Sequence, residues 1–339
     1  YAIYKLGWSY YNLKSKSESE TKKNIKKSIA AFKLVVKLSE SSDRSSFDLR
    51  QEAIKDLTMV WADTGGSKKA EDYFMDNGEE SAFYNVLERM GNLYKERGDN
   101  RKAISTYLRL VDESPERKNN PEVYSKVVEL QNKVGFLSGV TKNLERMTDL
   151  YVKSSTWTKE NSTDQTIVNE AKDKTEHLLQ RFGKMFHKRG HKSKRKEYLI
   201  AASEIYLLYL DTFPENKNAY ETRFLLADIF FNIQKFDRAA DEYLDVANRQ
   251  PKTGKFLKQA SMLAVVSIKK LDAKTKYEKL PPLGQVIKPI PLPRVKKRLV
   301  EVVDNYVLLL PKEKKGFPMR YSAAQIFFDY GHYNQAISR

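Results

Sequence analysis

The stretch that decides the fold runs from Asn85 to Pro115 and reads NVLERMGNLYKERGDNRKAISTYLRLVDESP. Before Gly98, apolar residues recur at the three- and four-residue spacing of one helix face. A second stripe with the same spacing begins at Ala103, after the Gly98-Asp99 break, and Pro115 closes it. The stretch therefore predicts two antiparallel helices joined by a short turn.

The same pattern of helix, turn and helix recurs along the chain. The second complete copy begins at Tyr220 and fills the corresponding positions with Leu226, Ala227, Phe230, Ala239, Tyr243 and Pro251. Weaker copies open at Leu6, Ile54, Tyr124, Leu179, Leu257 and Arg320, which gives about eight units in all. Each repeat has a small residue in its second helix. At this position, Ala70 and Ala103 of successive repeats are 33 residues apart. Ala202 and Ala239 are 37 residues apart, so the spacing indicates a repeat protein.

The repeat resembles the tetratricopeptide repeat family, whose unit has about 34 residues. The family's positions are occupied by Leu87, Met90, Gly91, Tyr94, Ala103, Tyr107 and Pro115. This resemblance implies an all-α fold, a right-handed α-solenoid of stacked helix-turn-helix units. We expect an N-terminal array of about four units at 1–153 and a linker with the start of a long helix at 154–175. A C-terminal array of about four units should occupy 176–339, with a Pro-rich insertion at 281–294 and a last unit cut off at Arg339.

Two stretches depart from the repeat pattern. The Ser/Thr-rich stretch from Ser154 to Asp164 predicts a loop, followed by an unusually long helix at about 167–188. The Pro-rich insertion is too dense in proline for a helix and should be extended. A packed or mobile loop is favoured there over a Pro-rich ligand motif, because no regular PxxP repetition continues.

The sequence contains no motif for nucleotide binding, serine hydrolysis or metalloprotease chemistry, and it has no cysteine. We therefore predict that the protein is not an enzyme and uses no cofactor. His187 and His191 have a four-residue spacing that could ligate a metal on one helix. Arg189-Gly190 interrupts them, cations crowd the segment and no carboxylate lies between them. A solvated basic turn is the favoured interpretation, and no metal site is predicted.

The chain is basic, with 61 Lys and Arg against 44 Asp and Glu and a formal net charge of +17. The densest group, named the polyanion patch, consists of Lys188, Arg189, Lys192, Lys194, Arg195 and Lys196. Two smaller groups are Lys269, Lys270, Lys274 and Lys276, and Arg294, Lys296, Lys297 and Arg298. Such groups either contact phosphates and other polyanions or only keep the surface soluble. A helical repeat that binds nucleic acid therefore stays open as the alternative function.

In the family, the first helices of successive units line a concave groove that binds extended peptides or partner helices. The resemblance places these residues in that groove: Tyr4, Trp8, Tyr11, Asn85, Glu88, Asn92, Lys95, Phe224, Phe231, Tyr321 and Phe328. Exposed aromatic side chains there would be hot spots for a protein partner. The alternative is that a preceding unit covers Tyr4 and Trp8 and a following unit covers Phe328.

These features predict an adaptor or scaffold that binds other proteins within a multiprotein complex. The first unit, YKLGWSYYNL at 4–13, is similar to long bacterial cell-envelope tetratricopeptide proteins, including those of gliding machinery. This resemblance implies a periplasmic or envelope-associated location. No run of about 18 apolar residues predicts a transmembrane helix. The chain opens at Tyr1 inside an apolar helical pattern, so the natural N-terminus is expected to be missing.

Overall fold

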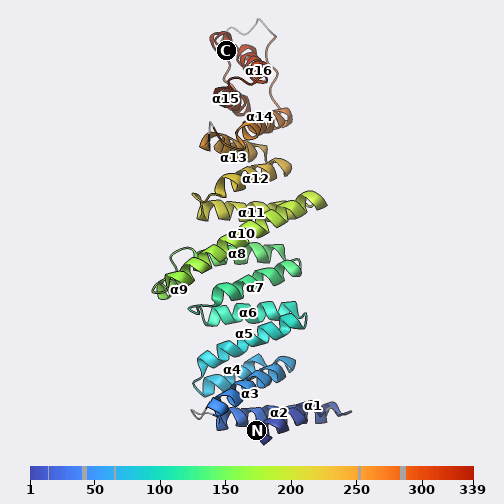
Figure 1. The fold of residues 1–339 in the computed structure, drawn as a ribbon. Coiled ribbons are helices and arrows are strands. Elements are labelled where there is room, and N and C mark those ends of the chain that lie inside the picture. The colour runs from blue at the N-terminus through green and yellow to red at the C-terminus, as the bar shows by residue number, and fades with distance from the viewer. Residues whose placement is uncertain (14, 40–43, 65, 251–252, 283–287) are drawn as a thin grey trace. The chain divides into compact units, whose positions relative to one another are not determined.

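The computed structural model describes residues 1–13, 15–39, 44–64, 66–250, 253–282 and 288–339. Within these residues the regular structure is α-helical, with no strand, and consecutive helices fold back on one another as hairpins (Figure 1). The predicted all-α solenoid of helix-turn-helix units is confirmed. In this part of the chain no helix is long and apolar enough to span a membrane.

The chain divides into two compact units, Tyr1–Thr175 (unit 1) and Glu176–Arg339 (unit 2), and the division falls within helix α10 (Gln165–Ser193). The other helices of unit 1 are α1 (Ala2–Asn12), α2 (Glu18–Leu38), α3 (Arg44–Asp63), α4 (Ser67–Asp76), α5 (Glu80–Glu96), α6 (Asn100–Glu113), α7 (Asn120–Lys133), α8 (Leu137–Tyr151) and α9 (Thr156–Glu160). The other helices of unit 2 are α11 (Lys196–Thr212), α12 (Ala219–Asn232), α13 (Phe236–Arg249), α14 (Leu257–Lys274), α15 (Arg294–Leu309), α16 (Gly316–Asp329) and α17 (Tyr333–Ile337).

The hairpin of α5 and α6 has the form that its sequence predicts. Gly98 makes the turn with a φ of +82°, a left-handed value that glycine adopts without strain. Leu87 and Met90 on α5 are fully buried, as is Ala103 on α6. These small and large residues interdigitate, so the two helices pack closely and bury a continuous apolar face.

The second complete copy forms the hairpin of α12 and α13 in unit 2. Ala227 and Ala239 are fully buried at the contact between the two helices. Arg223 occupies the position where most of the helix-turn-helix repeats have a large apolar residue. Its guanidinium pairs with Glu242 and Asp245 of α13, each at 2.7 Å. An ion pair therefore joins the two helices at a position that is apolar in other units.

The Ser/Thr-rich stretch differs from the prediction of a loop, because it contains the short helix α9. Ser155 and Thr158 form a capping box at its N-terminus. Trp157 is buried, and its Nε1–H donates to the backbone oxygen of Arg117 at 2.9 Å. Burial of one large aromatic side chain orders a stretch whose other residues favour a loop.

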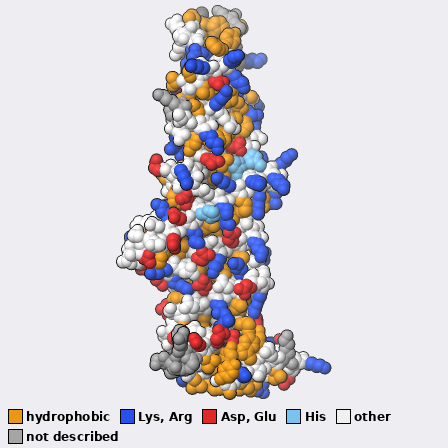
Figure 2. Space-filling view, viewed as in Figure 1, with side chains coloured by type: hydrophobic (Ala, Val, Ile, Leu, Met, Phe, Trp, Pro, Cys, Tyr) orange, Lys and Arg blue, Asp and Glu red, His pale blue; other side chains and the backbone are white. Residues whose placement is uncertain are grey.

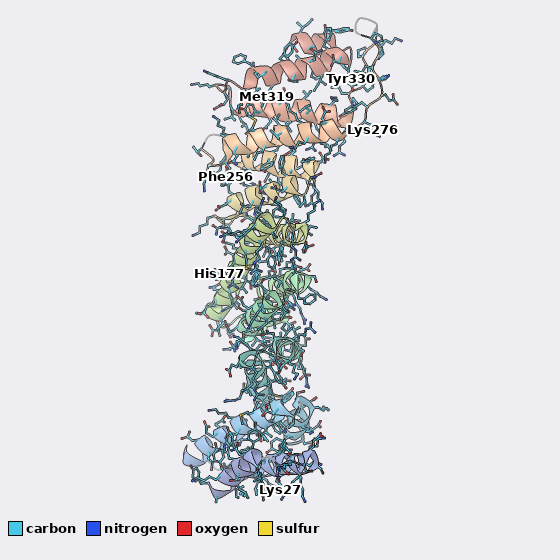
Figure 3. The ribbon with its side chains drawn as sticks, turned by 90° about the vertical axis from the view of Figure 1, so that its right-hand side faces the viewer. Lys27, His177, Phe256, Lys276, Met319 and Tyr330 are labelled. Carbon is cyan, nitrogen blue, oxygen red and sulfur yellow. The ribbon has the colours of Figure 1, made fainter. Side chains whose placement is uncertain are left out.

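The Pro-rich insertion lies between α14 and α15, and its residues 283–287 are outside the described residues. Its described residues before Arg294, the first residue of α15, are not helical, in agreement with the density of proline. The backbone N–H of Ile290 donates to the Tyr330 oxygen at 2.9 Å, and His332 Nε2 bonds the Ile290 oxygen at 2.8 Å. Tyr330 is labelled in Figure 3, at the end of α16. The described end of the insertion is therefore a packed connection.

Candidate partner-binding surface

The predicted groove residues on α1 pack against α3. The Tyr4 hydroxyl and the Trp8 Nε1–H both donate to Asp56 Oδ2, at 2.6 and 2.8 Å. Both rings also contact Phe32 edge-on, with centroids 5.8 and 6.1 Å away. Tyr4 and Trp8 are half-buried, so they hold α1 in place and leave only part of their surface to a partner.

A chain of polar contacts continues from α1 across the next two first helices. The Tyr11 hydroxyl donates to Asp63 on α3, and the same carboxylate pairs with Arg97 at the C-terminal end of α5. Burial, followed by the hydrogen bond to Asp63, raises the pKa of Tyr11 to about 12. Tyr11 therefore acts mainly as a link between α1 and α3.

The hollow on α5 is the part of this surface that leaves room for a ligand. It has a volume of about 350 Å³ and is lined by Asn85, Glu88, Arg89, Asn92, Leu93 and Glu96. The structure thus brings three of the predicted groove residues together in one depression. Lys95, the fourth predicted residue on this helix, is exposed and does not line the hollow.

The charges of the hollow divide into a paired and an unpaired set. Glu88 pairs with Arg117 at 3.2 Å and with Lys126 at 3.3 Å, and all three side chains are about four-fifths buried. Among the described residues, Arg89 and Glu96 form no ion pair within 4.0 Å. These two side chains are two helical turns apart on one face, so they are the charges available to a ligand.

Asn92 has both a structural contact and a place in the hollow. Its Oδ1 accepts the Tyr107 hydroxyl at 2.7 Å and lies 3.3 Å from Lys126 Nζ. Burial raises the pKa of the Tyr107 phenol, so this hydroxyl remains a donor. The Asn92 amide is therefore held in a fixed orientation by α6 and α7.

The predicted groove aromatics of unit 2 do not form one surface. Phe224 differs from the prediction because it is buried, stacked on Phe256 with ring centroids 4.2 Å apart. Phe231 is half-buried against Phe236. Tyr321 and Phe328 on α16 are 72% and 43% exposed. The α16 aromatics are therefore the most accessible of the four, whereas Phe256, just before α14, covers Phe224.

The polyanion patch and the third basic group differ in their surroundings. All six side chains of the polyanion patch are exposed, from the C-terminal end of α10 through the following turn to the start of α11, and among them Arg195 pairs with Glu197. In the third group, Arg294 pairs with Asp237, Arg298 with Asp241 and Lys296 with Asp272, at 2.5, 2.5 and 2.9 Å. These last pairs fasten α15 to α13 and α14, which gives that group a structural role.

Two carboxylates with evident roles were missed by sequence reasoning. Asp56 is buried between α1 and α3, where it accepts two side-chain hydrogen bonds. Asp228 on α12 lies beside both His187 and His191 of α10. The sequence has 44 acidic residues. Asp56 and Asp228 differ from the others by their partners on another helix, and only the fold reveals those partners.

Comparison with known proteins identifies the repeats. The sequence model of the tetratricopeptide repeat family matches residues 1–41 and 86–117, which include α1, α2, the C-terminal part of α5 and all of α6. These two segments carry tetratricopeptide repeats. Such repeats generally mediate protein–protein interaction, and proteins of this fold are generally non-catalytic scaffolds. No curated protein sequence matches the chain.

Several solved tetratricopeptide structures are similar to parts of this chain. The TPR2AB-domain:pHSP90 complex of yeast Sti1 has 13% identity over 81% of this chain and 98% of that one, with a TM-score of 0.26. A tetratricopeptide repeat protein from Parabacteroides merdae has 14% identity over 89% and 99%, with a TM-score of 0.24. The C-terminal part of a TPR repeat-containing protein from Cytophaga hutchinsonii has 14% identity over 93% and 98%, with a TM-score of 0.28. Because these TM-scores are low, the similarities do not indicate which partner this chain binds.

Proposed function

We propose that this chain is a non-catalytic scaffold that binds an extended segment of another protein in the hollow on α5. The observation that carries the proposal is the hollow itself, a depression of about 350 Å³ on a first helix of the repeat array. It is lined by polar side chains, with Leu93 as its one apolar lining residue. A polar, open depression of this kind suits a peptide better than an apolar small molecule.

The lining suggests what such a peptide must offer. The side-chain oxygens of Asn85 and Asn92 already accept hydrogen bonds from neighbouring side chains, so their NH2 groups are the ones that match the C=O groups of an extended backbone. Arg89 and Glu96 supply one charge of each sign. We therefore expect the bound segment to carry an acidic and a basic side chain, spaced to meet the two ends of the hollow.

A peptide-display selection tests this function without knowledge of the partner. We expect the wild-type chain to enrich peptides with both an acidic and a basic residue, and to bind them with measurable affinity. Arg89→Ala and Glu96→Ala should each weaken that binding about tenfold or more, because each removes a complementary charge. Lys95→Ala is the matched control, since Lys95 is exposed on the same helix but outside the hollow.

The selection also has a clear negative result. If Arg89→Ala and Glu96→Ala bind the enriched peptides as tightly as the wild type, the hollow is not the binding surface. If the control Lys95→Ala loses binding as strongly as they do, the contacts come from the general charge of α5 and not from the hollow.

We place this scaffold in a bacterial envelope-associated, periplasmic assembly. The support is the similarity of its first unit to cell-envelope proteins, together with a net charge of +17 that suits anionic envelope polymers. Fractionation of the source cells, followed by detection with an antibody to this chain, tests the location. Recovery in the envelope or periplasmic fraction is expected, and recovery in the cytosol alone would contradict it.

The alternative function is binding of nucleic acid or another polyanion through the polyanion patch. The exposure of its side chains favours it, whereas the ion pairs of the third basic group oppose a continuous basic stripe. Binding to a nucleic-acid duplex should fall steeply with salt if this alternative is correct. Retention of protein partners after nuclease treatment would favour the scaffold.

A further inference from the structure

His187, His191 and Asp228 form a compact cluster of potential metal ligands in unit 2. The two imidazoles lie one turn apart on α10, and their Nε2 atoms are 2.8 Å from each other. Asp228 on α12 brings its Oδ2 to 3.2 Å from His187 Nε2 and 3.1 Å from His191 Nε2. Three lone-pair-bearing atoms from two helices therefore converge on one point.

The structure removes two of the three sequence objections to a metal at this position, the interruption of the helix and the missing carboxylate. Helix α10 continues without interruption to Ser193, so Arg189 and Gly190 do not separate the two histidines. Gly190 is packed against α11, where a Cβ would lie 2.6 Å from Leu199 Cδ2. The missing carboxylate is supplied by Asp228, 37 residues beyond His191. A fold contact, and not a local motif, completes the ligand set.

We propose that His187, His191 and Asp228 bind a divalent transition-metal ion of the zinc class. A tetrahedral zinc ion with ligands at about 2.0 to 2.1 Å has ligand atoms about 3.3 Å apart. The three distances in the cluster, 2.8, 3.1 and 3.2 Å, are close to that value. Two imidazoles and one carboxylate are a donor set that suits zinc.

Hydrogen bonding alone satisfies this cluster poorly. In a neutral imidazole only one ring nitrogen carries a proton, and the other is an acceptor. Three mutually close atoms would then share one or two protons, and at least one contact would join two acceptors or two donors. A cation at the centre satisfies all three atoms at once. The competing arrangement is a protonated histidine paired with Asp228. Zinc titration distinguishes this ion pair from a metal site.

Neighbouring groups orient two of the three ligands, Asp228 and His187. The Asn232 amide donates to Asp228 Oδ2 at 3.2 Å. Tyr206 packs edge-on against the His187 ring, with centroids 5.9 Å apart, and its hydroxyl lies 3.4 Å from His187 Nδ1. The Tyr206 contact is on the far side of the His187 ring from Nε2, and such contacts fix the position of a ligand and strengthen metal binding. His187 is thus a preformed ligand, anchored in the core between α10 and α11.

The site is open on one side and faces a basic surface. The His191 side chain is 43% exposed, so water can reach a fourth coordination position. Lys188 and Lys192 are exposed nearby. Figure 2 shows Lys and Arg side chains beside histidine side chains on the face in view. Solvent and salt screen such exposed cations. The C-terminal end of α10 also favours a cation, because helix carbonyls there carry partial negative charge.

Zinc titration of the untagged, chelator-treated chain tests the proposal. Isothermal titration calorimetry should show one zinc ion per chain, and the melting temperature should rise with zinc because binding favours the folded state. Cobalt in place of zinc should give the visible absorption of a four-coordinate ion. His191→Ala and Asp228→Asn should each lower the affinity at least tenfold and remove the cobalt absorption.

His177→Ala provides the matched control. His177 is an exposed histidine on the same helix, outside the cluster, and is labelled in Figure 3. This variant should bind zinc as the wild type does. Because His191 is exposed, its replacement should leave the helix content measured by circular dichroism unchanged. Equal zinc binding by the wild type and His191→Ala, or absence of binding by the wild type, would overturn the proposal in favour of a protonated pair.

Discussion

Gly91 on α5 lies directly against the ring of Tyr107 on α6: a Cβ on Gly91 would lie 2.7 Å from Tyr107 Cδ1 and closer still to Cε1. Gly183 and Tyr206 have the same relationship in unit 2, where a Cβ would lie 2.5 Å from the ring. In both hairpins the missing side chain of the first helix makes room for the aromatic ring of the second. Close helix packing is thus the physical basis of the glycine and aromatic positions in the repeat.

Gly91→Ala should destabilise unit 1 by about 1 to 3 kcal/mol, because the added methyl group overpacks the contact with Tyr107. This overpacking cost outweighs the gain in helix stability of up to about 1 kcal/mol that alanine usually gives over glycine inside a helix. Gly316→Ala is the control, since its nearest neighbour, Val307 Cγ2, would be 3.6 Å away. Chemical denaturation measures both. A Gly91→Ala variant as stable as the wild type would contradict the packing relationship.

The repeat architecture could be predicted from sequence because the hairpin is local. Both helices and the turn at Gly98 lie within about 34 residues, so periodicity and turn chemistry determine them. Helix α9 was missed because its order comes from Trp157, which bonds Arg117 about 40 residues earlier. Local patterns do not report such contacts.

Asp56→Ala should loosen helix α1, because it leaves the Tyr4 hydroxyl and the Trp8 Nε1–H without their shared acceptor. Loss of hydrogen bonds to a charged, buried group costs about 1.5 to 3 kcal/mol. Amide hydrogen exchange should show faster exchange across α1. Asp56→Asn keeps an acceptor oxygen and should have a smaller effect.

Asp48→Ala is the matched control for Asp56, because Asp48 is exposed on the same helix. It should leave exchange in α1 unchanged. If Asp56→Ala also leaves α1 protected, then the aromatic contacts with Phe32 hold the helix without the carboxylate.

The candidate surface was harder to predict than the fold. The family resemblance placed Asn85, Glu88 and Asn92 on the face where the structure has a hollow. It also placed Phe224 there, although Phe256 covers that ring. Phe256 lies in the irregular segment between α13 and α14. The repeat pattern does not predict the conformation of that segment. Asp228 was missed for a similar reason, since its partners lie on another helix.

Glu88 and Lys126 should show a favourable coupling energy of about 1 kcal/mol in a double-mutant cycle with Glu88→Gln and Lys126→Gln. Their side chains are only 18% and 20% exposed, which limits screening by water. The pair Asp149 and Lys153 is the control, because both are about half exposed and should couple by about 0.3 kcal/mol. Equal coupling energies would mean that burial of the α5 to α7 pair has no effect on its strength.

Alkaline pH should destabilise unit 1 through Tyr11. Its pKa is raised to about 12 in the folded chain by burial and then by the hydrogen bond to Asp63, against an ordinary value of 10.0. Between these values the unfolded chain has lost the phenolic proton and the folded chain retains it. The free energy of unfolding therefore falls as pH rises from 10 to 12. The stabilisation is complete below pH 10 and is lost as pH passes through the folded pKa.

Tyr11→Phe should therefore flatten the decline of the unfolding free energy between pH 10 and 12, measured by urea denaturation at several pH values. Tyr209→Phe gives an independent test in unit 2. Burial, and then the charge of Glu176, raises the pKa of Tyr209 to about 12 as well. The two residues are far apart in sequence and lie in different units, so their effects on the pH slope should add. A slope that is the same in Tyr11→Phe and the wild type would show that the phenol is as free to ionise in the folded chain as in the unfolded one, and that the hydrogen bond to Asp63 does not hold α1 against α3.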